Sequence, residues 1–340
     1  MHYDRRLRPS QPATPSADAF TIHRCEVPPT PGRDGLSIAF VREGVGGYPL
    51  LLLHGYPETK RIWWRNIEPL AAAGYEVIVP DLRGYGDSDL SSAGVYDLAA
   101  YSRDLYALVH DALGHEHCGV VGGDVGGATA VDLIHRYPGF VEKLVFFNTV
   151  PPMVIDDFVA AGIDVGSITA ISDGPTGDYR RRQGATPDEL AAELDTPEKR
   201  RRYVGDMYGH RLWASPGTFS SEDVDFMTEP FATEERLRAG WAVYQLAYGR
   251  QASEPAIMNR KVDVPTLVLY GMDDHVVGPD FVHCCEVAFT NRVGPVVIPG
   301  AGHFLQWERA DIFNPLVAAF FGDLRVAHAS RAARGDEVPS

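Results

Sequence analysis

The chain alternates short, continuous apolar runs with longer segments in which apolar and polar residues follow a helical period. Continuous apolar runs are typical of strands that are buried on both faces of a parallel sheet. The predicted strands are Phe20–Val27, Leu36–Glu43, Pro49–Leu53, Glu76–Asp81, Gly119–Asp124, Val141–Asn148, Thr266–Gly271 and Val296–Pro299. The predicted helices are Arg61–Ala73, Leu98–Leu113, Gly126–Tyr137, Pro279–Phe289 and Ile312–Phe321. This alternation predicts an α/β fold with a mostly parallel central sheet flanked by helices.

The alternation stops after Asn148, and residues 151–255 show no strong strand pattern. Within them, Thr186-Pro187 and Thr196-Pro197 have the residue types that begin helices. We therefore expect a helical cap at 151–255, inserted into a core formed by 19–150 and 256–325. The Pro/Ser-rich residues 1–18 and the polar residues 326–340 are predicted to be a flexible arm and a flexible tail.

The composition excludes several classes of protein. Of 340 residues, 45% are hydrophobic, which is typical of a globular protein, and the net charge of −15 disfavours binding to nucleic acid. No run approaches the roughly 18 apolar residues of a membrane span, and no apolar stretch follows the charged N-terminus as in a signal peptide. The cysteines lack metal-ligand spacing, which favours free thiols in a reducing cytoplasm. They are Cys25, Cys118, Cys284 and Cys285.

The stretch GVVGGDVGG places an aspartate between small residues, where a predicted strand passes into a helix. A sharp turn of this kind presents its central side chain, Asp124, at the end of the strand. A carboxylate there can displace a leaving group at saturated carbon and form an ester on the enzyme. The alternative is an acidic helix cap on a glycine-rich turn.

Three further segments follow predicted strands and carry reactive groups. The turn HGYP can direct the backbone N–H of Tyr56 towards the aspartate, where it and the N–H of Val125 would form an oxyanion hole. GMDD and GAGHF supply an acid and His303 in the order aspartate, acid, histidine. The spacing from the glycine favours Asp274 over Asp273 as the acid.

These motifs together resemble the α/β-hydrolase superfamily, and within it the branch with an aspartate nucleophile. HGYPET, DLRGYGDS, GGDVGG, FFNTVPP, LYGMDDHVV and GAGHFLQWE occur in the family's order over about residues 36–322. The branch includes epoxide hydrolases, haloalkane dehalogenases and haloacetate dehalogenases. The resemblance implies a triad of Asp124, Asp274 and His303, and it implies no metal and no organic cofactor.

Epoxide hydrolases carry two cap tyrosines that protonate the epoxide oxygen. The resemblance indicates Tyr244 and, less directly, Tyr179, although Tyr203, Tyr208, Tyr248 or a simple packing role are alternatives. Four residues near the motifs are expected to contact the substrate, namely His54, Pro57, Trp64 and Phe304. For His54 the alternative is that it fixes a loop, and for Trp64 it is that it packs in the core. The runs Arg180–Arg182 and Arg200–Arg202 are more typical of solvated helix faces than of an anion site.

The residues around the nucleophile distinguish the activities of the branch. Haloalkane dehalogenases have a tryptophan after the aspartate to bind halide, and fluoroacetate dehalogenases have arginines there and three residues later. This chain has Val125 and Ala128 at those places. We therefore expect hydrolysis of a mostly apolar epoxide to a vicinal diol. Dehalogenation with the same triad and a non-catalytic binding protein are the alternatives, and a homodimer is possible.

Overall fold

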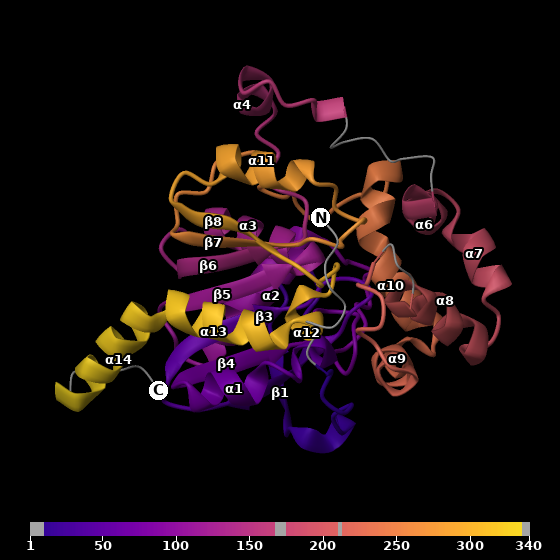
Figure 1. Ribbon diagram of the computed structural model, residues 1–340. Helices are drawn as coiled ribbons and strands as arrows, with labels where there is room; N and C mark the ends of the chain where they lie inside the picture. Colours follow the sequence, from indigo (N-terminus) through magenta and orange to yellow (C-terminus); the bar gives the residue numbers. More distant parts are fainter. Residues whose placement is uncertain (1–9, 167–174, 210–212, 335–340) are drawn as a thin grey trace.

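The computed structural model describes residues 10–166, 175–209 and 213–334, and its centre is an eight-stranded sheet (Figure 1). From β3 and β4 to β8 all paired strands are parallel, whereas β2 runs antiparallel to both of its neighbours. This is the mostly parallel sheet that the apolar runs predict. In sheet order the strands are β1 (Ile22–Val27), β2 (Leu36–Glu43), β4 (Tyr75–Pro80), β3 (Tyr48–Leu53), β5 (Cys118–Gly123), β6 (Val141–Phe147), β7 (Thr266–Gly271) and β8 (Arg292–Ile298).

Helices cover the sheet, with α13 in front of the strands in Figure 1 and α3 behind them. The pair α1 and α13 pack together, as do α2 and α3. The core helices are α1 (Ile67–Ala72), α2 (Leu98–Tyr106), α3 (Asp124–Arg136), α11 (Asp280–Ala288), α12 (Leu305–Glu308), α13 (Ala310–Phe320) and α14 (Gly322–Arg334). The predicted helix Arg61–Ala73 is divided into a 3-10 turn, Lys60–Trp63, and α1.

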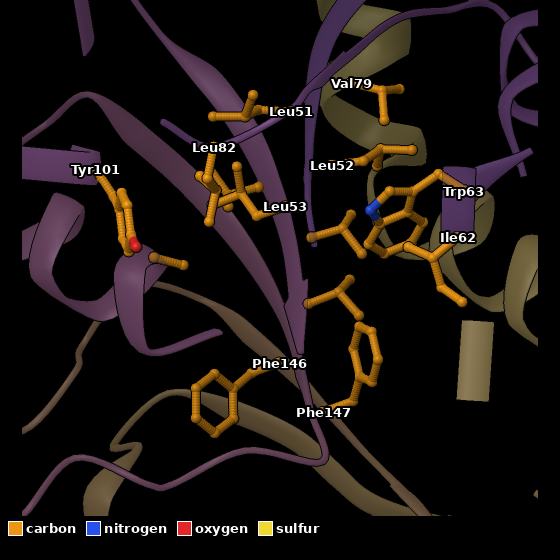
Figure 2. Close-up of a cluster of buried hydrophobic side chains, with 14 of the residues drawn as sticks. Leu51, Leu52, Leu53, Ile62, Trp63, Val79, Leu82, Tyr101, Phe146 and Phe147 are labelled. Carbon is orange, nitrogen blue, oxygen red and sulfur yellow. The ribbon is translucent and has the colours of Figure 1, made fainter. Parts of the chain in front are cut away.

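The centre of the sheet is apolar on both faces, as Figure 2 shows for β3 and its neighbours. Leu51, Leu52 and Leu53 are fully buried, and because side chains alternate along a strand they serve both layers of the core. Phe146 and Phe147 of β6 point to opposite faces, and Phe147 meets the indole of Trp63 edge to face. This two-sided burial explains why the strands are continuous apolar runs rather than alternating ones.

The segment between β6 and β7 contains helices and no strand among its described residues. Its helices α6 to α10 gather at one end of the sheet (Figure 1). Side chains from α6 and α10 line a cavity together with Asp124, at the point where β5 passes into α3. The helices are α4 (Ile155–Ala160), α6 (Pro175–Ala185), α7 (Pro187–Glu193), α8 (Pro197–Gly209), α9 (Ser221–Thr228) and α10 (Glu234–Gln245).

The predicted flexible arm is packed between the core and these helices where the structure describes it, from residue 10 onwards. The side chain of Gln11 accepts a hydrogen bond from Arg65, and the hydroxyl of Thr14 donates to Asp223 of α9. Arg65 also pairs with Asp223 at 3.3 Å. Arg65 and Asp223 thus bind the arm, and the composition of the arm alone gives no sign of these contacts. Residues 1–9 lie outside the described ranges.

The C-terminal segment and the edge strand also differ from the prediction. Part of the predicted flexible tail is helical, because α14 reaches Arg334 and packs the buried His328 against the ring of Tyr48. Strand β8 begins at Arg292 rather than Val296, since an edge strand tolerates the proline at position 295. All four cysteines are free. Within the described ranges, no helix combines the length and apolar character that a membrane crossing requires.

Candidate active site

Asp124 lies at the turn between β5 and α3, and its backbone is forced into a conformation that few side chains adopt. Its φ angle is +46°, in the left-handed region. A Cβ on Gly126 would lie 2.4 Å from the carbonyl oxygen of Leu53, so only glycine allows the helix to begin this close to β3. The hydroxyl of Thr149 donates to the carbonyl oxygen of Asp124 at 2.5 Å. The turn therefore holds the carboxylate at the end of the sheet.

A histidine joins this carboxylate to a second one. The Nε2 atom of His303 lies 3.4 Å from Oδ2 of Asp124, and its Nδ1 atom lies 3.0 Å from Oδ2 of Asp274. The other oxygen of Asp274 accepts hydrogen bonds from the backbone N–H groups of Val276 and Val277 at 2.8 and 3.1 Å. The two carboxylates thus hold the imidazole ring between them.

The neighbouring aspartate has a different partner. Asp273 accepts a hydrogen bond from the hydroxyl of Ser215 at 2.5 Å. Of the two residues considered from the sequence, the structure therefore places Asp274 beside His303. Asp273 instead connects the core to the segment that precedes α9.

The charges of this group support one another. Burial alone lowers the pKa of His303, but the charge of Asp274 and the contacts with Asp124 outweigh it and raise that pKa to about 10. Burial alone raises the pKa of Asp124, but His303 and the N–H groups of Tyr56 and Val125 outweigh it and hold that pKa below its usual value. The contact between His303 and Asp124 therefore favours the protonated form of the ring and the charged form of the carboxyl group.

The turn after β3 provides the N–H group expected from the sequence. The backbone N–H of Tyr56 donates to Oδ1 of Asp124 at 2.7 Å. A Cβ on Gly55 would lie 2.4 Å from the Cβ of Asp124, so glycine is required for this approach. The carboxylate of Glu58 accepts from the N–H of Gly55 at 2.6 Å and holds the turn in place. From the sequence, Glu58 had no signal beyond its place in the motif HGYPET.

Asn148, just after β6, connects the segments that carry Asp124, Asp274 and His303. Its carbonyl oxygen accepts from the N–H of Asp124 at 3.2 Å. Its side-chain oxygen accepts from the N–H of Gly271 at 2.9 Å, at the end of β7 and three residues before Asp274. Its amide nitrogen donates to the carbonyl oxygens of Gly302 and His303 at 2.8 and 3.0 Å. From the sequence, Asn148 was noted only as part of the motif FFNTVPP, and no role was predicted for it.

A cavity of about 330 Å³ opens above Asp124. Its wall is mainly apolar, and both tyrosines indicated by the resemblance, Tyr179 of α6 and Tyr244 of α10, line it. Their rings meet edge to face with centroids 5.7 Å apart. The wall also includes Val125, Ala128 and Thr149 from the core, and Val243 and Leu246 from the α10 region.

The alternative tyrosines have other surroundings and do not line this cavity. The hydroxyl of Tyr208 donates to the carbonyl oxygen of Pro57, and that of Tyr203 accepts from the amide of Gln183 at 3.0 Å. Tyr248 is 41% exposed. The geometry thus favours Tyr179 and Tyr244 over these three.

Two of the expected substrate contacts have structural partners instead. The Nε2 atom of His54 accepts from the backbone N–H of Leu82 at 2.9 Å, so this buried ring fixes two loops. The indole N–H of Trp64 donates to the carbonyl oxygen of Ser16 at 3.1 Å, and Trp64 does not line the cavity. The position of His54 therefore fits the alternative of fixing a loop, and that of Trp64 fits the alternative of packing in the core.

Pro57 and Phe304 also lie outside the cavity wall. Phe304 is fully buried between the rings of Trp213 and Tyr208, with nearly parallel stacking on both. The carbonyl oxygen of Pro57 accepts from Tyr208. Phe304 thus packs beside the ring of His303, and neither residue belongs to the cavity wall that a substrate would contact.

One arginine of the run 180–182 differs from the solvated face that the sequence favours. Arg180 lines the cavity, and its Nε–H donates to the phenol oxygen of Tyr179 at 2.9 Å. Arg181 and Arg182 instead form ion pairs with Asp178 and Glu193. The sequence could not separate these residues, because three adjacent arginines share one pattern and only the packing of α6 distinguishes them.

Comparison with known proteins places this arrangement in a family. A family model described as alpha/beta hydrolase fold matches residues 48–310. The chain belongs to the α/β-hydrolase family. The fold predicted from the motifs is thereby confirmed, and the protein is a hydrolase enzyme.

Relatives of this hydrolase match it over most of the length of each chain. It is 29% identical over 297 residues to the "Soluble epoxide hydrolase" of Corynebacterium sp. (strain C12), a match that covers 86% of this chain and 96% of that protein. It is 27% identical over 315 residues to "Epoxide hydrolase 3" of Mus musculus, covering 90% and 79% of the two chains. The solved structure "Epoxide hydrolase CorEH without ligand" shares the fold, with a TM-score of 0.73 at 24% identity over 90% of this chain and all of the other.

Proposed function

We propose that this hydrolase opens an epoxide to a vicinal diol through an ester on Asp124. The observation that carries the proposal is the position of two tyrosines across an apolar cavity from a carboxylate that contacts His303. The relatives named epoxide hydrolase, at 29% and 27% identity, support the same substrate class.

In the first step the two oxygens of Asp124 have different roles. Oδ1 is held by the N–H of Tyr56, which leaves Oδ2 to attack an epoxide carbon. The carbon–oxygen bond of the ring breaks, and the epoxide oxygen takes a proton from a tyrosine of the cavity wall, Tyr179 or Tyr244. A phenol, with an ordinary pKa of about 10, is a suitable acid for a forming alkoxide. The product is a hydroxyalkyl ester on Asp124.

The second step uses His303 as a base. Ester formation removes the negative charge of Asp124, one of the groups that raise the pKa of His303. The ring passes its proton through solvent to the tyrosinate left by the first step and, once neutral, removes a proton from a water molecule that attacks the carbonyl carbon of the ester. The N–H groups of Tyr56 and Val125 stabilise the resulting oxyanion, each by about 3 kcal/mol. The bond between that carbon and the diol oxygen then breaks, the leaving oxygen takes a proton from His303, and the carboxyl proton of Asp124 returns to the ring. Asp274 orients the ring throughout.

The residues that follow Asp124 disfavour dehalogenation, and the buried charged groups disfavour a role in binding alone. Val125 and Ala128 line the cavity and have no side-chain donor for a halide, and the indole of Trp64 donates to a backbone carbonyl instead. A binding protein would not require a buried aspartate–histidine–aspartate arrangement, which is costly unless it is used. We therefore propose neither dehalogenation nor binding alone.

Trapping the ester tests the proposal. His303→Gln should form the ester and fail to hydrolyse it, so incubation with a styrene-type epoxide should add the mass of the epoxide to the peptide that contains Asp124. The variant with both His303→Gln and Asp124→Asn is the matched control and should gain no mass. An unmodified peptide in the first variant, although the wild type releases diol, would refute the covalent mechanism. Halide release from haloalkanes by the wild type would favour the dehalogenase instead.

A further inference from the structure

Arg180 is a cation in the cavity wall that lacks the carboxylate partner of other buried arginines. Arg65 pairs with Asp223, and Arg83 pairs with Asp104 at 2.6 Å. For Arg180, no carboxylate lies within ion-pair distance among the described residues. A partly buried charge without a counter-charge is costly, so its position calls for another explanation.

The hydrogen bonds of Arg180 are directed at a phenol and a backbone carbonyl. Its Nε–H donates to the oxygen of Tyr179 at 2.9 Å, and Nη2 donates to the carbonyl oxygen of Val276 at 3.3 Å. The second bond attaches the guanidinium to the loop just after Asp274. The cation is therefore held beside the Tyr179 oxygen by a fixed part of the core.

This arrangement determines what the Tyr179 hydroxyl can do. A phenol carries one hydrogen, and because its oxygen already accepts from Arg180, that hydrogen remains available for another acceptor. A phenolate at this position would face a guanidinium. Burial raises the pKa of Tyr179 to about 12, and the charge of Arg180 opposes that rise. Burial raises the pKa of Tyr244 well above its usual value, and the charge of Arg180 opposes that rise there too, but among the described residues Arg180 makes its phenol hydrogen bond to Tyr179.

We propose that Arg180 is a positioning residue that makes Tyr179 the principal proton donor of ring opening, with Tyr244 as a second hydrogen-bond donor. This inference rests on the proposed epoxide hydrolysis. When Oδ2 of Asp124 bonds to the epoxide carbon, the electron pair of the broken bond goes to the epoxide oxygen, which takes the Tyr179 proton. The phenolate charge is stabilised by the guanidinium. Tyr179 then regains a proton from the imidazolium of His303 through solvent, which leaves that ring neutral for the second step.

A double-mutant cycle tests this role, with Arg180→Met, Tyr179→Phe and their combination. The measured quantity is the rate of ester formation in a single turnover with a neutral epoxide. Because a hydrogen bond to a charged group is lost, Arg180→Met should slow that step roughly 10- to 100-fold. Adding it to Tyr179→Phe should cost less than about twofold, since its partner is already gone. Hydrolysis of the preformed ester should stay within about twofold of the wild-type rate in both single variants.

Two further variants separate charge from structure. Arg180→Lys keeps the charge and should recover much of the lost rate of ester formation. Arg181→Met is the matched control, because the neighbouring side chain is exposed and pairs with Asp178 on the surface. It should leave both steps unchanged. Circular dichroism establishes that each variant is folded.

The outcomes distinguish this inference from the function on which it rests. Additive losses in the cycle, or equal slowing of both steps by Arg180→Met, would overturn the role of Arg180 while the ester on Asp124 still forms. A loss confined to epoxides that bear a carboxylate would replace it with recognition of an anionic substituent. If the wild type forms no ester at all, the proposed function fails and this inference fails with it.

Discussion

The buried Glu58, which holds the turn beside Asp124, should make the protein less stable as the pH rises. Glu58 is 3% exposed, and burial raises its pKa from 4.5 to about 7. One carboxylate oxygen accepts from the N–H of Gly55 and the other accepts from the amide of Gln306 at 2.9 Å. The Oε1 atom of Gln306 has no hydrogen-bond partner in the described part of the chain. The perturbation we consider is Glu58→Gln, which keeps the shape and removes the charge.

The sign and the size follow from the shift in pKa. A carboxyl group whose pKa is raised by folding binds its proton more tightly in the folded state, so its contribution to stability is present below pH 4.5 and is lost as the pH rises through 7. At 1.36 kcal/mol per unit, the loss approaches about 3 kcal/mol. The amide of Glu58→Gln does not titrate. If the Gln306 amide flips, the NH₂ group introduced by Glu58→Gln can donate to Oε1 of Gln306. The hydrogen bonds to Gly55 and to Gln306 are then both kept.

Urea unfolding at pH 5, 6, 7 and 8 measures this effect. The variant should approach the wild type in free energy of unfolding at pH 5 and exceed it by about 2–3 kcal/mol at pH 8. A difference that does not grow with pH, or a variant that is the less stable protein at pH 8, would refute the reasoning.

A second buried glutamate provides the matched contrast. Burial raises the pKa of Glu308 to about 7 as well, but its oxygens accept from three backbone N–H groups, those of Ser215, Gly302 and Phe304, and from the hydroxyl of Thr218. In either orientation the NH₂ group of Glu308→Gln would point at a backbone N–H. An unsatisfied donor of this kind costs about 1–3 kcal/mol. The same substitution should therefore give a smaller gain than at Glu58, or a loss, at pH 8.

Three other changes test the site and its frame. Gly126→Ala should destabilise the protein by about 1–3 kcal/mol, measured by urea unfolding, because the new Cβ would lie 2.4 Å from the carbonyl oxygen of the last residue of β3. Asp274→Asn should lower the pKa of His303 from about 10 and slow ester hydrolysis at least roughly 100-fold in single turnovers, while ester formation changes much less. Arg65→Met should cost about 3–5 kcal/mol in thermal unfolding, because it leaves the buried carboxylate of Asp223 without its cation; a change below 1 kcal/mol would contradict this.

The sequence by itself determined the architecture and the order of the reactive groups. Strands buried on both faces must be continuous apolar runs, so their pattern was visible without the structure. The glycines around Asp124 and before Tyr56 are required by close backbone approach, which makes those motifs local and recognisable. Asp274 and His303 were predicted from their places after strands, and the structure brings His303 between Asp274 and Asp124. Element ends were less well predicted, as at β8, because an edge strand tolerates residues that interior strands exclude.

Only the tertiary structure decided which residues surround these groups. Trp64 and His54 lie beside the motifs in sequence, yet their donors and acceptors are used by backbone groups from other parts of the chain. Arg180 is adjacent to two arginines of the same type, and the rotation and packing of α6 alone bring it into the cavity beside Tyr179. Contacts between residues distant in sequence depend on how elements pack, and one chain's local pattern does not record that packing.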